Sequence, residues 1–176
     1  MLVGSRCRVR AYAPEDVTSL PSVAGDPSVA RWMTARFPHP YTLEDAKAWV
    51  DSVSSEDPAN HFAIEVDGRL AGGIGLEPLN GEWQGGAAFG YWLAPEHRGR
   101  GIATEAGRLL VSHAFRERHF RRLEAYVFAP NVASARVLEK LGFHREAVVR
   151  EALVDRDGAV TDAWLYGQLR SKTLVS

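Results

Sequence analysis

Cysteine is nearly absent from this sequence of 176 residues, in which Cys7 stands alone. A single cysteine excludes an internal disulfide and any metal site built from several cysteines. The six histidines show no metal-ligand spacing either, so we expect no bound metal. Cys7 lies in a strand-like stretch near the N-terminus, where we expect a buried structural thiol rather than a nucleophile.

Long apolar runs and an excess of charge are also missing. No run approaches the roughly 18 residues that span a bilayer, and residues 1–6 lack the apolar core of a signal peptide. We therefore expect no membrane partner and a reduced, cytoplasmic compartment. The net charge of −1 gives no general attraction to nucleic acid. The basic run at residues 116–122 favours a solvated helix end, and an RNA-binding accessory role would rest on that run alone, so we expect no nucleic-acid partner.

What remains is the composition of an ordinary folded domain. Hydrophobic residues make up 45% of the chain and charged residues 24%. No linker, repeat or low-complexity block interrupts the sequence, which therefore predicts one domain over residues 1–176.

The period of the apolar residues predicts the order of the elements. Strands are expected at 6–11, 62–66, 70–76, 88–93, 123–128, 147–154 and 160–169. Helices are expected at 16–20, 27–34, 43–53, 102–114 and 132–141. Thr42 has the position of an N-cap with Asp45 three residues on, Asp67-Gly68 is typical of a hairpin turn, and Gly142 is typical of a helix end. This order predicts an α/β (α+β) fold in which helices pack on a mixed sheet.

The most informative segment is Tyr91–Ala106. A strand stops at Pro95, a short basic glycine loop follows, and a helix begins near Ile102. Glycines let backbone N–H groups converge, and a helix N-terminus adds about half a positive charge, so the segment suits a pyrophosphate. Arg98 and Arg100 would add ion pairs. The spacing fits neither the P-loop nor the dinucleotide fingerprint; the alternative is a solvated turn before an ordinary helix.

These residues resemble a known family. Arg98-x-x-Gly101-x-Ala103 is similar to the acyl-CoA signature of the GCN-five-related N-acetyltransferases, abbreviated GNAT. The resemblance to the RimJ/RimL branch of that superfamily rests on Gly90-Tyr91-Trp92-Leu93 and on Asn131-x-x-Ser134…Glu139-Lys140-Leu141-Gly142-Phe143. The element order extends it over nearly the whole chain.

The resemblance implies the GNAT acyl-CoA N-acyltransferase fold, with a mixed, mostly antiparallel central sheet flanked by helices, and acetyl-CoA as co-substrate. Backbone N–H groups of the loop would take the pyrophosphate, and the end of the preceding strand would pair with the pantetheine arm. The implied cofactor-binding residues are Trp92, Leu93, Ala94, Arg98, Gly99, Arg100, Gly101, Ile102, Ala103, Thr104, Asn131 and Ser134.

The resemblance also implies an N-acetyltransferase in which a primary amine attacks the thioester directly, in a ternary complex. The acceptor would be a protein N-terminal α-amine or a small amine such as a polyamine or an amino-sugar drug. Many relatives place a glutamate where this chain has Ala88, so Glu77 and Glu82 are candidate bases, although each also suits a solvated surface position. An N-terminal α-amine, with a pKa near 8, would need less help from a base.

For the acid that protonates the departing thiolate, much of the superfamily uses a tyrosine at the position of Leu138. RimJ/RimL relatives instead carry a serine, which is Ser134 here. The alternative is purely structural, with Asn131 as N-cap and Ser134 in the first turn of the helix.

Three wider questions stay open at this point. Because Ala88 and Leu138 leave two common catalytic positions empty, a non-catalytic acetyl-CoA sensor is the alternative function. A homodimer is compatible with the family, and residues 164–169 would either join its interface or close the sheet. The aromatic residues that fit either an acceptor pocket or the core are Trp32, Phe37, Tyr41 and Trp49.

Overall fold

The computed structural model describes residues 1–170. Its strands are β1 (Leu2–Val3), β2 (Arg8–Arg10), β3 (His61–Val66), β4 (Arg69–Pro78), β5 (Gly86–Leu93), β6 (Arg122–Phe128), β7 (His144–Val154) and β8 (Val160–Leu169). Its α-helices are α1 (Asp16–Ala24), α2 (Pro27–Ala30), α3 (Leu43–Ser54), α4 (Ile102–Arg116) and α5 (Val132–Lys140). Two short 3₁₀ helices are η1 (Gly81–Trp83) and η2 (Pro95–His97).

The strands form an eight-stranded mixed sheet in the order β1-β2-β3-β4-β5-β6-β8-β7. The pairs β1–β2, β2–β3, β3–β4, β6–β8 and β7–β8 are antiparallel, and β5–β6 is parallel, with Gly86 opposite Arg122. The expected mixed, mostly antiparallel sheet with helices is therefore confirmed. Contacts divide the chain into two compact units, unit 1 (residues 1–75 and 91–109) and unit 2 (the rest).

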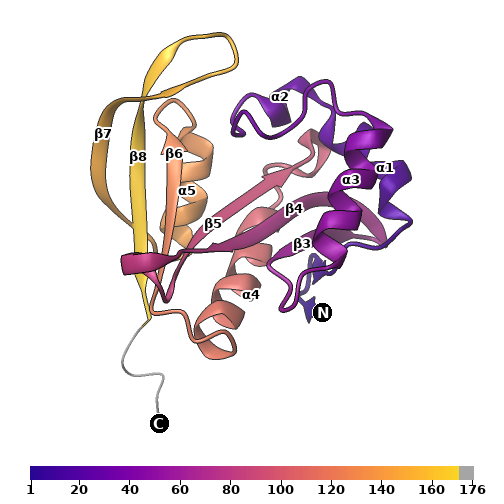
Figure 1. The fold of residues 1–176 in the computed structure, drawn as a ribbon, viewed down its shortest axis with the longest axis horizontal. Coiled ribbons are helices and arrows are strands. Elements are labelled where there is room, and N and C mark those ends of the chain that lie inside the picture. The colour runs from indigo at the N-terminus through magenta and orange to yellow at the C-terminus, as the bar shows by residue number, and fades with distance from the viewer. Residues whose placement is uncertain (171–176) are drawn as a thin grey trace. The chain divides into compact units, whose positions relative to one another are not determined.

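Unit 1 is organised around a core that two helices build with the sheet. Helices α1 and α3 pack against each other (Figure 1). They contribute Leu20 and Val50, which are at most 3% exposed, to a cluster that Ala63 of β3 also joins. Removing such side chains from water contributes about 25 cal/mol per Å² of apolar surface, which is why amphipathic helices hold to the sheet here.

A buried ion network fixes the start of α1. Asp16 is 4% exposed, and its carboxylate accepts hydrogen bonds from Arg10 Nη1 (2.7 Å), Arg10 Nη2 (2.9 Å) and the N–H of Ala13 (2.8 Å). Arg10 Nε also donates to Glu65 on β3 at 2.7 Å. The paired carboxylates raise the pKa of Arg10, so this guanidinium stays charged.

Helix α3 begins as its sequence predicts. The Thr42 hydroxyl accepts from the N–H of Asp45 at 3.1 Å, and the Asp45 carboxylate accepts from the N–H of Thr42 at 2.9 Å. This reciprocal capping box satisfies two backbone donors that the helix itself leaves unpaired.

Unit 2 has its own core between α5 and the strands β6, β8 and β7, which lie side by side in Figure 1. Tyr166 is fully buried and its hydroxyl donates to Glu139 Oε1 at 3.0 Å. The rings of Phe89 and Phe143 lie 5.5 Å apart, and Leu138 is 1% exposed. Leu138 is thus a core residue of α5.

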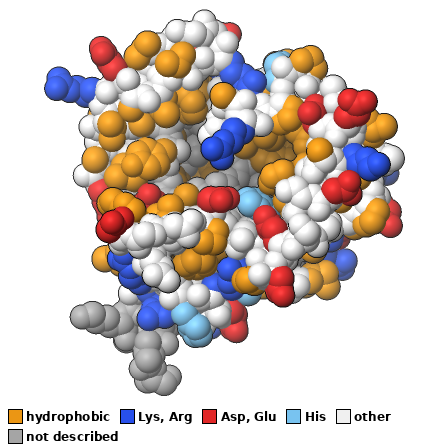
Figure 2. Space-filling model, in the orientation of Figure 1, with side chains coloured by type: hydrophobic (Ala, Val, Ile, Leu, Met, Phe, Trp, Pro, Cys, Tyr) orange, Lys and Arg blue, Asp and Glu red, His pale blue; other side chains and the backbone are white. Residues whose placement is uncertain are grey.

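The β7–β8 pair carries exposed apolar side chains, and Figure 2 shows orange atoms over this part of the molecule. The exposed hydrophobic residues on the two strands are Val148, Val149, Val154, Val160 and Leu169. The register of β7 also shifts between Arg145 and Ala147 and between Val149 and Leu153. Such irregularities are common on edge strands, where they oppose further strand pairing.

Several boundaries differ from those predicted. Helix α1 continues past Pro21 to Ala24, because Leu20 and Ala24 are both fully buried and this packing outweighs one lost backbone bond. Helix α2 ends at Ala30 rather than residue 34, and β7 begins at His144 rather than residue 147. Strand β1 was not predicted, since two residues give no periodic signal.

Candidate active site

The loop between β5 and α4 has the backbone that the sequence predicts for an anion cradle. After η2, Gly99 and Gly101 have φ values of 73° and 77°, in the left-handed region that favours glycine. The first helical bond of α4 runs from the N–H of Glu105 to the carbonyl of Gly101, at 3.0 Å. The N–H groups of the three preceding residues, 102–104, therefore have no partner within the helix. Nothing lies within 4 Å of a Cβ built on Gly99, so the loop has open space beside it.

Arg98 holds this loop at its first residue. Its Nε donates to the carbonyl of Leu93 at 3.1 Å, and its Nη1 donates to the hydroxyl of Ser28 at 2.9 Å. Ser28 in turn donates to Asp26, whose pKa is lowered by those bonds and by the nearby Arg98 charge. The guanidinium therefore ties the end of β5 to the start of α2.

The end of β5 lies very close to β4. The N–H of Ala94 donates to the carbonyl of Ala71 at 2.9 Å, and a Cβ on Gly72 would overlap the carbonyl of Trp92. The close approach of the two backbones therefore requires a glycine at position 72. Some of the main-chain groups at Leu93 and Ala94 already have partners within the chain, because Leu93 accepts from Arg98 and Ala94 donates to β4.

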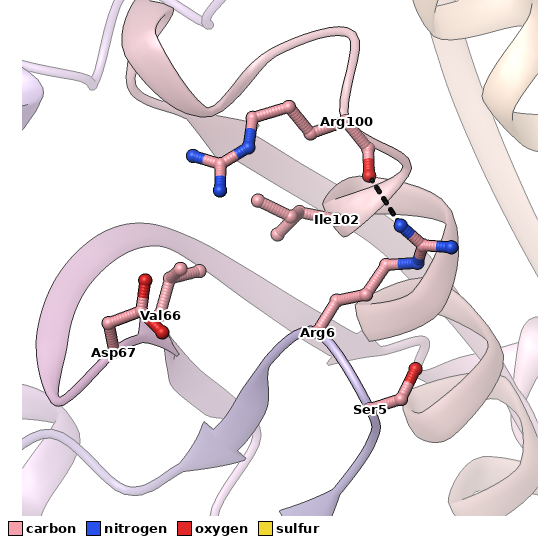
Figure 3. Close-up of a pocket in the computed structure, with 6 residues that line it drawn as sticks. All are labelled: Ser5, Arg6, Val66, Asp67, Arg100 and Ile102. Atoms are coloured by element: carbon pink, nitrogen blue, oxygen red, sulfur yellow. Dashed lines mark hydrogen bonds between the residues drawn. The ribbon is translucent and has the colours of Figure 1, made fainter.

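A second set of contacts ties the loop to the N-terminal segment. Glu105, in the first turn of α4, accepts from the N–H of Ser5, from the N–H of Arg6 (3.0 Å) and from the Ser5 hydroxyl (3.1 Å). Arg6 Nη1 donates to the carbonyl of Arg100 at 3.4 Å, the dashed line in Figure 3. Beside this contact lies an open pocket of about 240 Å³ lined by Ser5, Arg6, Val66, Asp67, Arg100 and Ile102 (Figure 3).

His97 adds a polar atom that needs an explanation. It ends the short helix η2, and its Nδ1 is buried with no hydrogen-bond partner among the described residues. Buried polar atoms usually have a partner. A bridging water would satisfy this one.

The predicted residues Asn131 and Ser134 lie in unit 2. The Asn131 side chain caps α5 by accepting from the N–H of Ser134 at 3.3 Å, as the structural interpretation expected. Ser134 is half-buried in the first turn of the helix. Leu138, one turn further on, is a core side chain and offers no proton.

The candidate bases Glu77 and Glu82 also lie in unit 2, near the end of β4 and in η1, and both are exposed. Ala88, where relatives carry a glutamate, is half-buried on β5 opposite Glu124 of β6. Glu124 is paired with Arg122 at 3.3 Å, and Arg122 also binds Glu146. This pairing makes Glu124 a structural ion partner in unit 2.

Among the titratable pairs that sequence reasoning missed is one of a histidine and a glutamate in unit 1. His61 Nδ1 lies 2.6 Å from Glu56 Oε1, and the His61 ring stands edge-on to Trp49 with the centroids 5.1 Å apart. Burial raises the pKa of Glu56, but the N–H of Asn60 and the His61 ring outweigh it, and the pKa lies below its ordinary value. A Glu and a His five residues apart across a loop have no periodic signature, so no sequence pattern could have shown this pair.

The four aromatic residues that the sequence left open between an acceptor pocket and the core all lie in unit 1. Tyr41 is 9% exposed and Phe37 packs 5.3 Å from it, ring to ring. Phe37 also lies 5.9 Å from the ring of Trp92, and Trp49 packs edge-on to Tyr12. Phe37, Tyr41 and Trp49 therefore belong to or border the hydrophobic core of unit 1. Trp32 is half-buried and stacks under Arg31.

Cys7 is buried, as expected, and its Sγ faces the carbonyl of Ile102 at 4.0 Å. Burial, with a contribution from Glu105, raises the pKa of the thiol to about 11. A thiol of this kind is protonated at neutral pH and is a poor nucleophile. Among residues 1–170, no group of three acidic, histidine or cysteine side chains is arranged to hold a metal ion, and no helix is long and apolar enough to cross a membrane.

A mixed sheet whose strand β5 leads through a glycine loop into α4 is the arrangement that the resemblance to the N-acetyltransferases implies, and comparison with known proteins supports that class. The model of the acetyltransferase (GNAT) domain matches residues 6–144, which is most of the chain. The chain belongs to the GNAT acetyltransferase family.

Individual relatives agree with this assignment. The chain is 40% identical over 117 residues to the probable N-acetyltransferase YjcK of Bacillus subtilis, a match over 63% of this chain and 64% of that protein. Mycobacterium smegmatis RimJ, in complex with CoA-disulfide, has a TM-score of 0.81 at 24% identity, over 98% of this chain and 88% of the other. Spermidine N-acetyltransferase from Vibrio cholerae, in complex with CoA and spermine, has a TM-score of 0.81 at 22% identity, over 97% of this chain and 99% of the other. At these identities the two structures establish the fold alone.

Proposed function

We propose that this protein transfers the acetyl group of acetyl-CoA to a primary amine by direct attack in a ternary complex. The observation that carries the proposal is the β5–α4 loop. It combines two left-handed glycines with a helix N-terminus whose first N–H groups have no helical partner. That chemistry suits a pyrophosphate, and two of the solved structures that share the fold hold CoA or a CoA disulfide.

In this proposal the backbone N–H groups from Arg98 to Ala103 take the pyrophosphate, with Thr104 beside them. The end of β5, at Trp92, Leu93 and Ala94, contacts the pantetheine arm. Because Leu93 and Ala94 already use some main-chain groups within the chain, the carbonyl of Leu93 would accept a second bond through its other lone pair.

The reaction balances without an acyl-enzyme. The amine nitrogen forms a bond to the thioester carbonyl carbon, the C–S bond breaks, and the electron pair leaves with the CoA sulfur. One proton leaves the attacking nitrogen for a carboxylate or water, and one reaches the thiolate. Cys7 takes no part, since burial raises its pKa to about 11 and its thiol packs on Ile102.

The two proton-transfer roles are assigned to named side chains. Ser134 is the proposed donor to the thiolate, supported by its place three residues after the capping Asn131 and by the core position of Leu138. Asn131 caps α5 with its side chain and keeps its backbone for the co-substrate. Glu77 and Glu82 are the proposed bases, and their exposure favours transfer through water rather than a buried direct base.

We propose a protein N-terminal α-amine as the first acceptor class, on the branch name and on the missing glutamate together. We assign the chain to the RimJ/RimL branch on Gly90-Tyr91-Trp92-Leu93 and on the motif that begins at Asn131. That branch favours a protein N-terminal α-amine, whose pKa near 8 suits a site without a glutamate at Ala88. A small amine, such as a polyamine, is the second acceptor class that the family resemblance implies. The single domain is supported by the family match, which runs through residues of both units. The homodimer and the cytoplasmic location stay predictions.

The test is release of the CoA thiol from acetyl-CoA, screened over N-terminal peptides, polyamines and aminoglycosides. We expect turnover on one acceptor class and a loss of at least tenfold in kcat for Ser134→Ala. Ser112→Ala, which removes an exposed hydroxyl from α4, is the matched control and should be unchanged. Tight acetyl-CoA binding with no turnover on any amine would instead favour the non-catalytic sensor.

A further inference from the structure

Residues 4–7, which we call the N-terminal strap, cross the first turn of α4. The strap is held there by one side chain, Glu105, which accepts hydrogen bonds from the N–H groups of Ser5 and Arg6 and from the Ser5 hydroxyl. Its carboxylate also lies 3.7 Å from Arg6 Nε. The Glu105 side chain is only 17% exposed, so these contacts are partly shielded from water.

The strap in turn reaches the loop. Arg6 Nη1 donates to the carbonyl of Arg100, the residue between the two left-handed glycines, and Figure 3 shows the guanidinium directed at that oxygen. The Arg6 side chain also lies within 4.0 Å of the position a Cβ would take on Gly101. Cys7 adds a third contact, from its thiol to the carbonyl of Ile102.

Gly99 and Gly101 give the loop a conformation that few other residues adopt, but glycines also give an unbound loop many alternatives. If a free loop adopts its binding-competent form for only a fraction of the time, the apparent Kd for its ligand is the intrinsic Kd divided by that fraction. External ties that restrict the loop before binding therefore raise the affinity for its ligand.

We infer that Glu105 is a positioning residue for acetyl-CoA, which holds the N-terminal strap so that Arg6 fixes the backbone of the phosphate loop at Arg100. This inference rests on the proposed function, because it assumes that the loop binds the pyrophosphate. Glu105 acts through the strap and does not touch the co-substrate.

Charge alone predicts the opposite change in affinity when Glu105 is removed, and this makes the inference testable. A carboxylate in the first turn of α4 repels a pyrophosphate at the same helix end, so by Coulomb's law its removal should tighten binding. If Glu105 positions the loop, its removal should weaken binding instead.

The experiment measures the Kd of acetyl-CoA by calorimetry, and KM and kcat by thiol release, on the full chain. We expect Glu105→Ala to raise Kd and KM about tenfold, from a competent loop fraction near one tenth, while kcat at saturating acetyl-CoA stays within about twofold. Glu105→Gln keeps one acceptor oxygen and should restore part of the affinity. A purely structural role would lower the melting temperature and kcat together without this split.

A second variant disturbs the same contact without removing the charge. A Cβ on Gly4 would overlap the Glu105 carboxylate, so Gly4→Ala should separate that carboxylate from the strap while its charge stays on α4. We expect it to raise the Kd in the same direction as Glu105→Ala, and it keeps the test valid if Glu105→Ala does not fold. Glu44→Gln removes an exposed carboxylate from the first turn of α3 and is the matched control, expected to leave the Kd unchanged.

The outcomes separate the two proposals. Wild-type protein that binds no acetyl-CoA overturns both. Wild-type binding with a Kd that is unchanged or lowered in Glu105→Ala and unchanged in Gly4→Ala overturns the positioning role alone. An increase in both variants, with kcat preserved, supports it.

Discussion

Arg98 offers a sharp test of how the phosphate loop works, because a lysine keeps its charge but not its shape. The planar guanidinium donates from Nε to Leu93 and from Nη1 to Ser28, two directions that a single ammonium group does not reproduce. If the residue serves only as a positive charge for the pyrophosphate, Arg98→Lys should be tolerated. If it ties β5 to α2, Arg98→Lys should weaken acetyl-CoA binding.

The magnitude follows from the exposure of the contacts. Hydrogen bonds from charged donors contribute about 1.5–3 kcal/mol each when they are shielded from water. Because Arg98 is exposed, we take about half of the lower value, or about 0.75 kcal/mol, for each of its two bonds. Two bonds then give about 1.5 kcal/mol, which corresponds to about a tenfold rise in Kd for acetyl-CoA. Calorimetric titration measures it directly.

Two companion variants decide the interpretation. Ser28→Ala removes the acceptor and leaves Arg98 unchanged, so it should weaken binding by about threefold, as expected for one of the two bonds. Arg100→Lys is the control, because Arg100 enters the network through its carbonyl, which a lysine retains, and a lysine also keeps the positive charge for an ion pair with the pyrophosphate. A Kd for Arg98→Lys within twofold of wild type, or an equal loss in Arg100→Lys, would refute the reasoning.

Three further predictions concern stability and reactivity. Asp16→Asn leaves the partly buried Arg10 with Glu65 alone, and should cost about 3 kcal/mol of unfolding free energy in urea titration. Arg8→Met, which removes a largely exposed partner of Glu65, should cost less than about 1 kcal/mol. Cys7, with a pKa of about 11 against an ordinary 9.0, should react with a thiol reagent at pH 8 roughly a hundredfold more slowly in the native protein than in urea, and equal rates would contradict its burial. The pKa of Glu56 is lowered in the fold, so its contribution to stability is complete above pH 4.5, the ordinary pKa, and is lost as the pH falls through the lower folded pKa. Glu56→Gln should therefore reduce the fall in melting temperature on the acid side, and an acid profile equal to that of the wild type would contradict this.

Much of the loop was predictable because local rules govern it. The end of β5 at Leu93, the start of α4 at Ile102 and the cap at Asn131 all follow from proline, glycine and asparagine at fixed offsets from apolar stripes. Thr42 likewise identified its helix start. These signals act within four or five residues, so one sequence is sufficient to read them.

The residues that tie the loop down were not predictable. Glu105 meets Ser5 across a separation of 100 residues, and Arg98 meets Ser28 across 70. Polar contacts between distant segments leave no period in the sequence, and the same Arg98 was assigned by its charge to the phosphate alone. Helix α1 was predicted too short for a related reason, since the burial of Ala24 outweighs the local effect of Pro21.

The two kinds of residue solve one physical problem. Glycines at 99 and 101 allow the backbone to turn its N–H groups towards an anion, yet the same freedom disfavours any single arrangement of the free loop. Arg98 restrains the loop at its start, and Glu105 restrains it further on through the strap and Arg6. Because both restraints act on one short backbone, the effects of Arg98→Lys and Glu105→Ala on the Kd of acetyl-CoA should not be additive. Once one tie is lost the loop is already free to move, so losing the second should weaken binding less than it does alone.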